Sequence, residues 1–210
     1  PIQWIPENPR WQNYVDIWHK IPLAKFVLNT VKLTLIVTFL QLLTSSFAAY
    51  AFAKLQFKGK NTLFLAYITT IAVPWQVYMV PQFMMMRSFG LADTHLAIIC
   101  LQAFSAFGVF MMKQFYEGIP TELCEAARID GMTEYQIWYK VMLPLSKPAL
   151  STLTIFTFVN TWNDFLGPLI YLTTESKKTL QLGLRMFISQ FGSEYGLIMA
   201  ASVLSLIPVL

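Results

Sequence analysis

Hydrophobic residues gather in long runs along this chain, and polar residues are concentrated in the connections between the runs. Five runs are poor in charge: residues 33–53, 61–86, 95–112, 148–163 (continuing past Asp164 to residue 174) and 195–210. An α-helix rises about 1.5 Å per residue and the hydrocarbon core of a bilayer is about 30 Å thick, so the first two runs are each long enough to cross it. The pattern predicts an all-α, polytopic bundle of transmembrane helices.

The composition of the chain also indicates a membrane protein. Of 210 residues, 56% are hydrophobic and 12% are charged, whereas a soluble domain carries about 25% charged residues. The net charge of +4 does not indicate nucleic-acid binding, because the basic residues are scattered between apolar runs. Lys and Arg are equally numerous on the two alternating sets of connections, so the positive-inside rule leaves the orientation open, although "KLQFKGK" after the first run favours the cytoplasm.

Aromatic residues near the start of the chain recur at helical spacing. Trp11, Tyr14, Val15 and Trp18 are typical of a short amphipathic helix at a membrane surface, and an irregular loop with anchoring tryptophans is the alternative.

Two prolines, Pro74 and Pro81, lie inside the second run. Each removes a helical hydrogen bond, so we expect this span to be kinked, as in proteins with internal cavities or moving parts. The alternative is that membrane helices simply tolerate proline.

The connection 113–147 is the longest polar passage between two runs. Thr121 can cap a helix whose first turn holds Glu122 and Glu125, where acidic residues are favourable at the positive end of the helix dipole. Gly131 then suits a left-handed turn that reverses the chain.

A second helix is expected directly after this turn. "TEYQ", from Thr133 to Gln136, has the spacing of a capping box, Pro144 is expected to end the helix, and Pro148 to open the next span. The passage predicts a helix-turn-helix outside the bilayer, where Tyr135 and Trp138 can fill a groove on another protein. An ordinary surface helix pair is the alternative.

The stretch "EAARIDGMTEYQIWYKVMLP" resembles the EAA loop of the permease subunits of binding-protein-dependent ABC importers. Seven positions carry the resemblance: Glu125, Ala126, Ala127, Gly131, Val141, Leu143 and Pro144, with Val141 where the family usually has Ile. "AAYAFAKLQFKGK", "VPWQVYMVPQF", "LPLSKPAL" and "TWNDFLGPLIYL" extend the likeness along the chain. They resemble the carbohydrate branch, close to maltose-system inner-membrane permeases.

The resemblance implies a single permease domain of the MetI-like type over 1–210, with 113–147 as a cytoplasmic loop that holds the coupling helix. This branch typically has six helices, so we expect the first helix and the end of the last to lie outside this sequence. The implied partners are a second permease subunit, two ATP-binding cassette subunits, an extracytoplasmic solute-binding protein and membrane lipid. The implied location is the cytoplasmic membrane of a bacterium or archaeon.

The family resemblance implies that a partner subunit, and not this chain, binds and hydrolyses ATP. This chain contains no Gly-x-x-x-x-Gly-Lys-Ser/Thr loop, and the nearest text, Gly59-Lys60-Asn61-Thr62, lacks the upstream glycine. We therefore expect a non-catalytic subunit that binds no cofactor, with ATP and Mg on the ATPase. His19 and His95 stand alone, so no metal site is expected either.

A polar group near the end of the fourth run is the candidate solute path. Asn160, Asn163 and Asp164 recur at i, i+3 and i+4, which predicts one polar helix side facing the bundle interior. A charge at membrane depth costs about 2.5 to 3.5 kcal/mol, so Asp164 needs partners or water. These groups can bind sugar hydroxyls while Trp162 or Trp75 stacks on a sugar face, and inter-helix hydrogen bonding is the alternative.

The expected activity is import of a sugar or oligosaccharide by alternating access. Import of a non-sugar solute such as glycerol phosphate or a polyamine stays open, because fold and coupling do not fix the ligand. An ion-driven secondary carrier or a channel is a further alternative.

The sequence also predicts the exposure of the two cysteines and the side of the membrane on which the connection 173–194 lies. Cys124 is expected to be accessible from the cytoplasm and Cys100 to be shielded within a span. The basic connection 173–194 is expected to face outward and to help meet the solute-binding protein.

Overall fold

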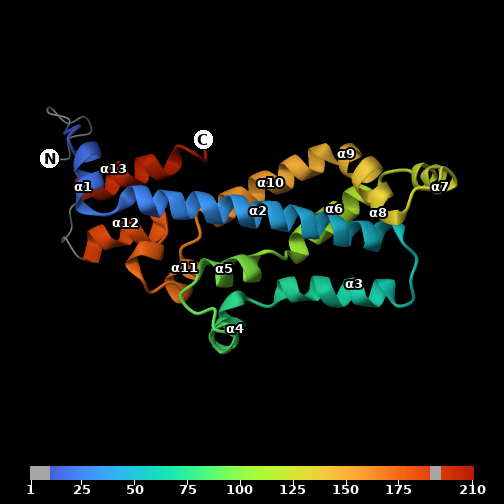
Figure 1. The fold of residues 1–210 in the computed structure, drawn as a ribbon, viewed down its shortest axis with the longest axis horizontal. Helices are drawn as coiled ribbons and strands as arrows, with labels where there is room; N and C mark the ends of the chain where they lie inside the picture. The colour runs from blue at the N-terminus through green and yellow to red at the C-terminus, as the bar shows by residue number, and fades with distance from the viewer. Residues whose placement is uncertain (1–9, 190–194) are drawn as a thin grey trace.

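The protein is an elongated bundle in which one long helix connects most of the other elements (Figure 1). The computed structural model describes residues 10–189 and 195–210, and this part of the chain holds helices and no strands. The helices are α1 (Asn13–Lys20), α2 (Leu23–Lys54), α3 (Lys60–Thr69), α4 (Trp75–Ser88), α5 (His95–Gln102), α6 (Ala106–Glu117), α7 (Glu122–Ile129), α8 (Glu134–Ile137), α9 (Leu143–Leu145), α10 (Lys147–Trp162), α11 (Leu166–Tyr171), α12 (Leu180–Ser189) and α13 (Tyr195–Leu206). Short 3₁₀ turns lie at Thr70–Ala72 and Glu175–Lys177, and Trp138–Met142 is a π-helix.

Helix α2 begins ten residues before the first hydrophobic run and extends for 32 residues. At its C-terminal half it packs against α6, α10 and the 121–145 passage, with Ala49 and Tyr50 fully or almost fully buried. At its N-terminal half, Leu23 and Phe26 are buried against α1, α12 and α13. Two hydrophobic cores therefore lie at the two ends of α2, and a third, formed by Leu33 with residues of α4, α5 and α11, lies between them.

The second run is broken rather than kinked, which corrects the expectation of one continuous span. Helix α3 closes in the turn Thr70–Ala72, and the axis turns by 102° before α4 (Figure 1). Val73, the residue before Pro74, is extended because proline disfavours the helical conformation in the residue preceding it. Pro81 lies inside α4 without ending it.

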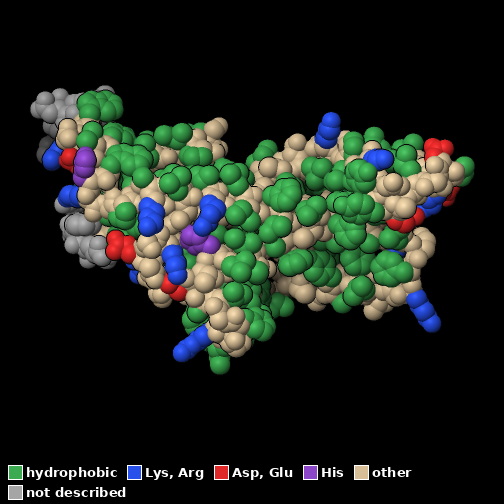
Figure 2. Space-filling model, viewed as in Figure 1, with side chains coloured by type: hydrophobic (Ala, Val, Ile, Leu, Met, Phe, Trp, Pro, Cys, Tyr) green, Lys and Arg blue, Asp and Glu red, His purple; other side chains and the backbone are tan. Residues whose placement is uncertain are grey.

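The later runs are helical but also interrupted. The third run forms α5 and α6, separated at 103–105, and the fourth forms α10 and α11, separated at 163–165. By length and composition, Leu23–Lys54 and His95–Glu117 can each cross a membrane, and the described residues give up to four spans if each bent pair is one span. A broad hydrophobic surface covers the middle of the long axis, and most charged side chains lie toward its ends (Figure 2).

The aromatic N-terminal segment is helical, as one of the two interpretations predicted. Helix α1 exposes Val15 and Trp18 and buries Ile17 against α13 and α2, and Trp11 is exposed in the turn before it.

Helices α2 and α6 approach closely because a glycine faces a serine where they meet. A Cβ added at Gly108 would lie 2.5 Å from the Ser45 Oγ atom, well inside van der Waals contact. Small residues at membrane helix contacts permit this kind of backbone approach.

We therefore expect Gly108→Leu to lower the free energy of unfolding by about 1 to 3 kcal/mol through overpacking. The measurement is a denaturant titration of the protein in detergent micelles. Gly118→Ala is the matched control, because its Cβ would meet only the Phe115 carbonyl at 3.4 Å. An unchanged midpoint for Gly108→Leu would show that α2 and α6 do not pack as described.

Candidate functional site

The 121–145 passage folds as two short helices joined by a tight turn. Gly131 has φ = +80°, so the left-handed turn predicted from the sequence is present. The capping box is also present: the Thr133 backbone N–H donates to Gln136 Oε1 at 2.9 Å, and the Gln136 N–H donates to Thr133 Oγ1 at 3.3 Å. Thr121 differs from expectation because its backbone is helical and its side chain caps nothing; its hydroxyl lies 3.5 Å from Lys54 Nζ instead.

The second helix ends at Leu145, one residue after Pro144, so its end lies close to the predicted one. The chain stays helical through the π-helix and α9 up to that residue. The axis then turns by 81° at Ser146 before α10 begins, with Pro148 in its first turn as expected. The passage and the fourth run are thus joined through a sharp bend.

The seven positions of the EAA resemblance divide between the surface and the interior. Ala127 is buried, Val141 and Leu143 are half-buried, and the remaining four are exposed: Glu125, Ala126, Gly131 and Pro144. Leu123 and Ile129 are exposed on α7, and Ile129 is 86% exposed. Neither residue was identified as a site residue from the sequence. Ile129, an apolar residue directly before the polar turn at Asp130 and Gly131, could have been noticed there.

Trp138 does not project outward to fill a groove, contrary to expectation. It is 3% exposed and meets the Phe47 ring edge-on, with centroids 5.2 Å apart. Tyr135 is 60% exposed and remains available at the surface.

Cys124 lies opposite to expectation, whereas Cys100 lies within the candidate span His95–Glu117. Cys124 is fully buried, with its Sγ atom 3.7 Å from Met142 Sδ, and burial raises the pKa of its thiol. Cys100 is exposed on α5. Position within a polar passage did not predict burial, because the passage packs its own core against α2.

An ion pair across the Gly131 turn fixes the two helices relative to one another. Arg128 Nε donates to Glu134 Oε1 at 2.7 Å and Arg128 Nη2 donates to Glu134 Oε2 at 3.2 Å. The Arg128 hydrogen bonds lower the pKa of Glu134. Two α2 side chains reach the same passage: the Tyr50 hydroxyl donates to Glu134 Oε2, and Lys54 Nζ donates to the Ile119 carbonyl.

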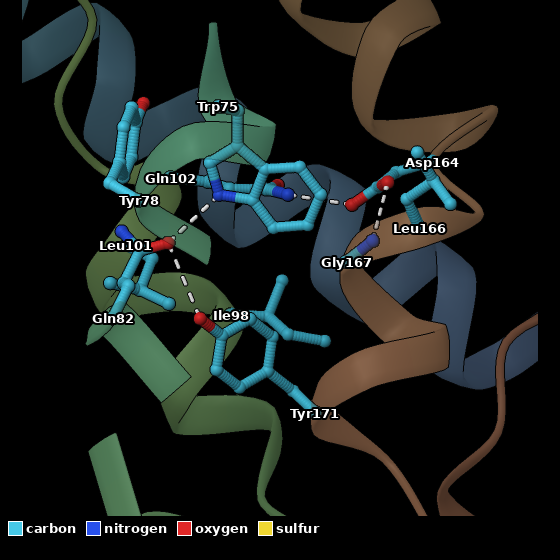
Figure 3. A pocket seen from close by; sticks show the side chains of 10 residues that line it. All are labelled: Trp75, Tyr78, Gln82, Ile98, Leu101, Gln102, Asp164, Leu166, Gly167 and Tyr171. Atoms are coloured by element: carbon cyan, nitrogen blue, oxygen red, sulfur yellow. Dashed lines mark hydrogen bonds between the residues drawn. The ribbon is translucent and has the colours of Figure 1, made fainter. Parts of the chain in front are cut away.

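A cavity of about 360 Å³, lined mostly by apolar surface with a few polar groups, lies near the middle of the molecule, between α4, α5 and α11 (Figure 3). Asp164 is at its edge, where Oδ2 accepts from Gln102 Nε2 at 2.7 Å and Oδ1 accepts from the Gly167 N–H at 3.1 Å. The polar groups do not line one continuous helix, because α10 ends at Trp162 and Asp164 lies in the break before α11. The break turns the carboxylate toward Gln102.

Aromatic rings also line the cavity (Figure 3). Trp75 Nε1 donates to Gln82 Oε1 at 2.8 Å, and the Tyr171 hydroxyl donates to the same oxygen at 3.3 Å. Tyr78 also lines the cavity. Trp75 was one of the two tryptophans named from the sequence, whereas the glutamines were missed because their partners are distant along the chain.

Asn160 lines a second, adjoining cavity of about 250 Å³ that shares Gln102 and Asp164 with the first. There the Thr157 hydroxyl donates to Gln41 Oε1 at 2.6 Å. The cavity wall therefore includes α2 and α10 as well as α5.

Two predicted solute-path residues lie elsewhere. Trp162 is 3% exposed, stacks on Phe158, and donates from Nε1 to the Ser205 carbonyl at 2.9 Å, so it is a core residue and not a sugar platform. Asn163 is exposed and lines neither cavity; its Nδ2 donates to the Val159 carbonyl at 3.0 Å.

The connection after α11 is tied to the loop before α5 and is less free than its basic residues suggested. Asp93 accepts from the Thr173 and Thr174 N–H groups at 2.9 and 3.0 Å and from Lys177 Nζ at 2.9 Å. The Thr174 side-chain hydrogen bond and Lys177 hold the pKa of Asp93 well below its usual range. Residues 190–194 of the predicted outward connection lie outside the described residues.

No group of three or more His, Cys, Asp or Glu side chains lies together within residues 10–189 and 195–210 in an arrangement that can hold a metal ion.

Comparison with known proteins identifies relatives of this chain. Residues 41–210 match the family model described as binding-protein-dependent transport system inner membrane component. The arabinooligosaccharides transport system permease protein AraQ of Halalkalibacterium halodurans is 38% identical over 181 residues, 86% of this chain and 65% of the relative. The lactose transport system permease protein LacG of Rhizobium radiobacter is 32% identical over 200 residues, 95% of this chain and 73% of the relative.

A solved structure has the same fold. A chain of a bacterial ABC transporter involved in the import of the acidic polysaccharide alginate superposes with a TM-score of 0.88 at 28% identity, covering 98% of this chain and 78% of that one. The chain described here spans about two thirds of the length of AraQ.

Gly131→Ala is expected to destabilise the two-helix passage through its backbone alone. Nothing lies within 4 Å of the added Cβ, so the cost is that of the left-handed conformation, about 1 to 2 kcal/mol. Hydrogen exchange of the amides of residues 122–130 in detergent measures it as faster opening. Gly131→Asn is the matched comparison and should lie closer to the parent, because Asn tolerates this conformation better; equal exchange in all three proteins would contradict the turn.

Proposed function

Because the chain belongs to the family of binding-protein-dependent transport system inner membrane components, we propose that it is the permease subunit of an ATP-driven importer of a sugar or oligosaccharide. The observation that carries the proposal is the match over 170 of 210 residues, counted from 41 to 210, which includes both the loop and the cavity. The names of the relatives support the solute class, since AraQ and LacG are permease proteins of arabinooligosaccharide and lactose transport systems.

The 113–147 passage is proposed to lie in the cytoplasm and to dock on an ATP-binding cassette subunit. Exposed residues of α7, namely Leu123, Glu125, Ala126 and Ile129, support this assignment, because they leave charged and apolar side chains available for a protein contact. Val141, Leu143 and Pro144 then connect the docked helix to α10. In this proposal the partner subunit binds ATP and Mg and hydrolyses the ATP.

The complete importer in this proposal contains this chain, a second permease subunit, two ATP-binding cassette subunits and an extracytoplasmic solute-binding protein. It lies in the inner membrane of a bacterium. Closure of the ATPase pair on ATP moves the docked loops and opens the cavity toward the binding protein, and hydrolysis resets it.

The central cavity is the proposed place where this chain meets the solute. Trp75 and Tyr78 offer ring faces to the apolar face of a sugar, and Gln82, Gln102 and Asp164 offer hydrogen-bonding groups to hydroxyls. Asn160 extends the polar lining into the adjoining cavity.

The test reconstitutes the full-length protein with its partners in liposomes and follows uptake of labelled arabino- and galacto-oligosaccharides. We expect uptake that needs both internal ATP and the binding protein and that stops when the ATPase subunit carries a Walker-A lysine substitution. Uptake that persists with that inactive ATPase, or that follows an ion gradient, would overturn the proposal in favour of a secondary carrier.

Asp164→Ala is expected to raise the solute concentration for half-maximal transport by about tenfold or more, since a hydrogen bond to a charged group contributes about 1.5 to 3 kcal/mol. Asn163→Ala is the matched control, because Asn163 neighbours Asp164 but lines neither cavity. Transport is normalised to assembled complex. Loss of complex with an unchanged concentration dependence would instead make Asp164 an inter-helix contact only.

A further inference from the structure

The Glu134 carboxylate receives hydrogen bonds from two different parts of the molecule. Arg128, on α7, approaches it with two guanidinium nitrogens, at 2.7 and 3.2 Å. Tyr50, on α2 and 2% exposed, donates its hydroxyl to Oε2 of the same carboxylate. One side chain at the start of α8 therefore touches both the docking helix and the long membrane helix.

We propose that Glu134 is the joint that makes the docking passage and α2 move as one body, with Tyr50 and Arg128 as its positioning partners. The inference rests on the proposed function, because it assigns the route by which movement of a docked loop reaches the far side of the membrane.

The covalent route out of the passage contains a bend, which makes a second connection necessary. Glu134–Leu145 and Lys147–Trp162 meet at 81°, and the first of these includes the π-helix Trp138–Met142. π-Helical turns are rare, frequently lie at functional sites, and are one of the few causes of sharp helix kinks. A push on α7 that passed only through α9 would be absorbed in part at this bend, whereas the Glu134 joint passes it to α2 directly.

A second contact secures the beginning of the same passage to α2. Lys54, in the last turn of α2 and 7% exposed, donates from Nζ to the Ile119 carbonyl. Its ammonium also lies 3.5 Å from Thr121 Oγ1. The two ends of α7 are thus connected to one helix, through Lys54 before it and through Glu134 after it.

The opposite end of α2 is held just as firmly. Asn29 Nδ2 donates to the Ser176 and Lys178 carbonyls at 3.0 and 2.9 Å, and the Leu180 N–H donates to Thr30 Oγ1 at 2.9 Å. Residues 30 and 50 are separated by about 30 Å at 1.5 Å per residue, which is the thickness of a bilayer core. An uninterrupted helix of this length moves as a rod, so the 176–180 segment follows the docking passage.

The experiment compares Tyr50→Phe, Glu134→Gln and the double variant with the parent in the complete reconstituted importer. Tyr67→Phe is the matched control: this tyrosine packs against the same core, and its hydroxyl makes no hydrogen bond within the described part of the chain. Two quantities are measured: solute moved per ATP hydrolysed, and hydrogen exchange of the amides of residues 122–142.

We expect the yield of complex and ATP hydrolysis without solute to stay at the parental level in Tyr50→Phe. Solute moved per ATP should fall by about fivefold or more, the lower end of measured couplings between sites. Exchange in residues 122–142 should accelerate while exchange in α10 stays unchanged, and the double variant should be no worse than Glu134→Gln. Tyr67→Phe should match the parent in both quantities.

Parental transport per ATP in both Tyr50→Phe and Glu134→Gln would overturn the joint while leaving the importer intact. Effects that simply add in the double variant would also overturn it, because partners in one contact are not independent. If the parental complex itself showed no ATP-dependent uptake, the proposed function would fail, and hydrogen exchange alone would decide the joint: unchanged protection in Tyr50→Phe would reject it.

Discussion

Helix breaks inside a membrane bundle release backbone hydrogen-bonding groups that lipid cannot satisfy, and the architecture of this protein depends on where those groups find partners. At the break after α5, Gln41 Nε2 donates to the Gln102 carbonyl at 3.2 Å and Thr44 donates to the Ala103 carbonyl at 2.6 Å. At the break after α10, Asp164 accepts from the Gly167 N–H. The side chains recruited for this purpose are polar, and two cavities form among them.

The helix breaks therefore also form the cavity, because they bring its lining side chains together. Straight helices over the same sequence would bury their backbone groups and present leucine and phenylalanine to one another. The breaks bring Gln102 and Asp164 within 2.7 Å, and the turn at Pro74 brings Trp75 and Gln82 to the cavity wall. Amide and carboxylate side chains can hydrogen-bond to the free backbone groups at a helix break. The same side chains can also hydrogen-bond to hydroxyl groups in the cavity.

Helix α2 connects this centre to both ends of the molecule. Its middle supplies Gln41 and Thr44 to the helix break, its C-terminal part holds the passage around Glu134, and Asn29 reaches the segment after α11. Each contact joins residues at least 59 positions apart in the chain, since the shortest of these separations is that of Thr44 and Ala103. The uninterrupted helix α2 is thus the element that relates the positions of these broken helices to one another.

The sequence by itself determined the features that depend on local chemistry. The apolar runs identified an all-helical membrane protein, glycine at position 131 and the Thr133–Gln136 spacing identified the turn and the capping box, and the EAA spacing identified the family. Each of these is encoded within a few residues, through hydropathy, the left-handed preference of glycine or the geometry of one helical turn. Pro74 predicted a kink in the second run but not the size of the turn there.

Only the tertiary structure decided which face each side chain presents and what it touches. Trp162, Trp138 and Cys124 lie in regions that looked exposed or path-lining and are buried, because distant helices cover them. Gln82, Gln102, Tyr50 and Glu134 looked unremarkable and share hydrogen bonds at two centres of the molecule. In a bundle whose helices are apolar on most sides, periodicity does not say which side meets another helix, so the contacts were set by packing between segments far apart in the chain.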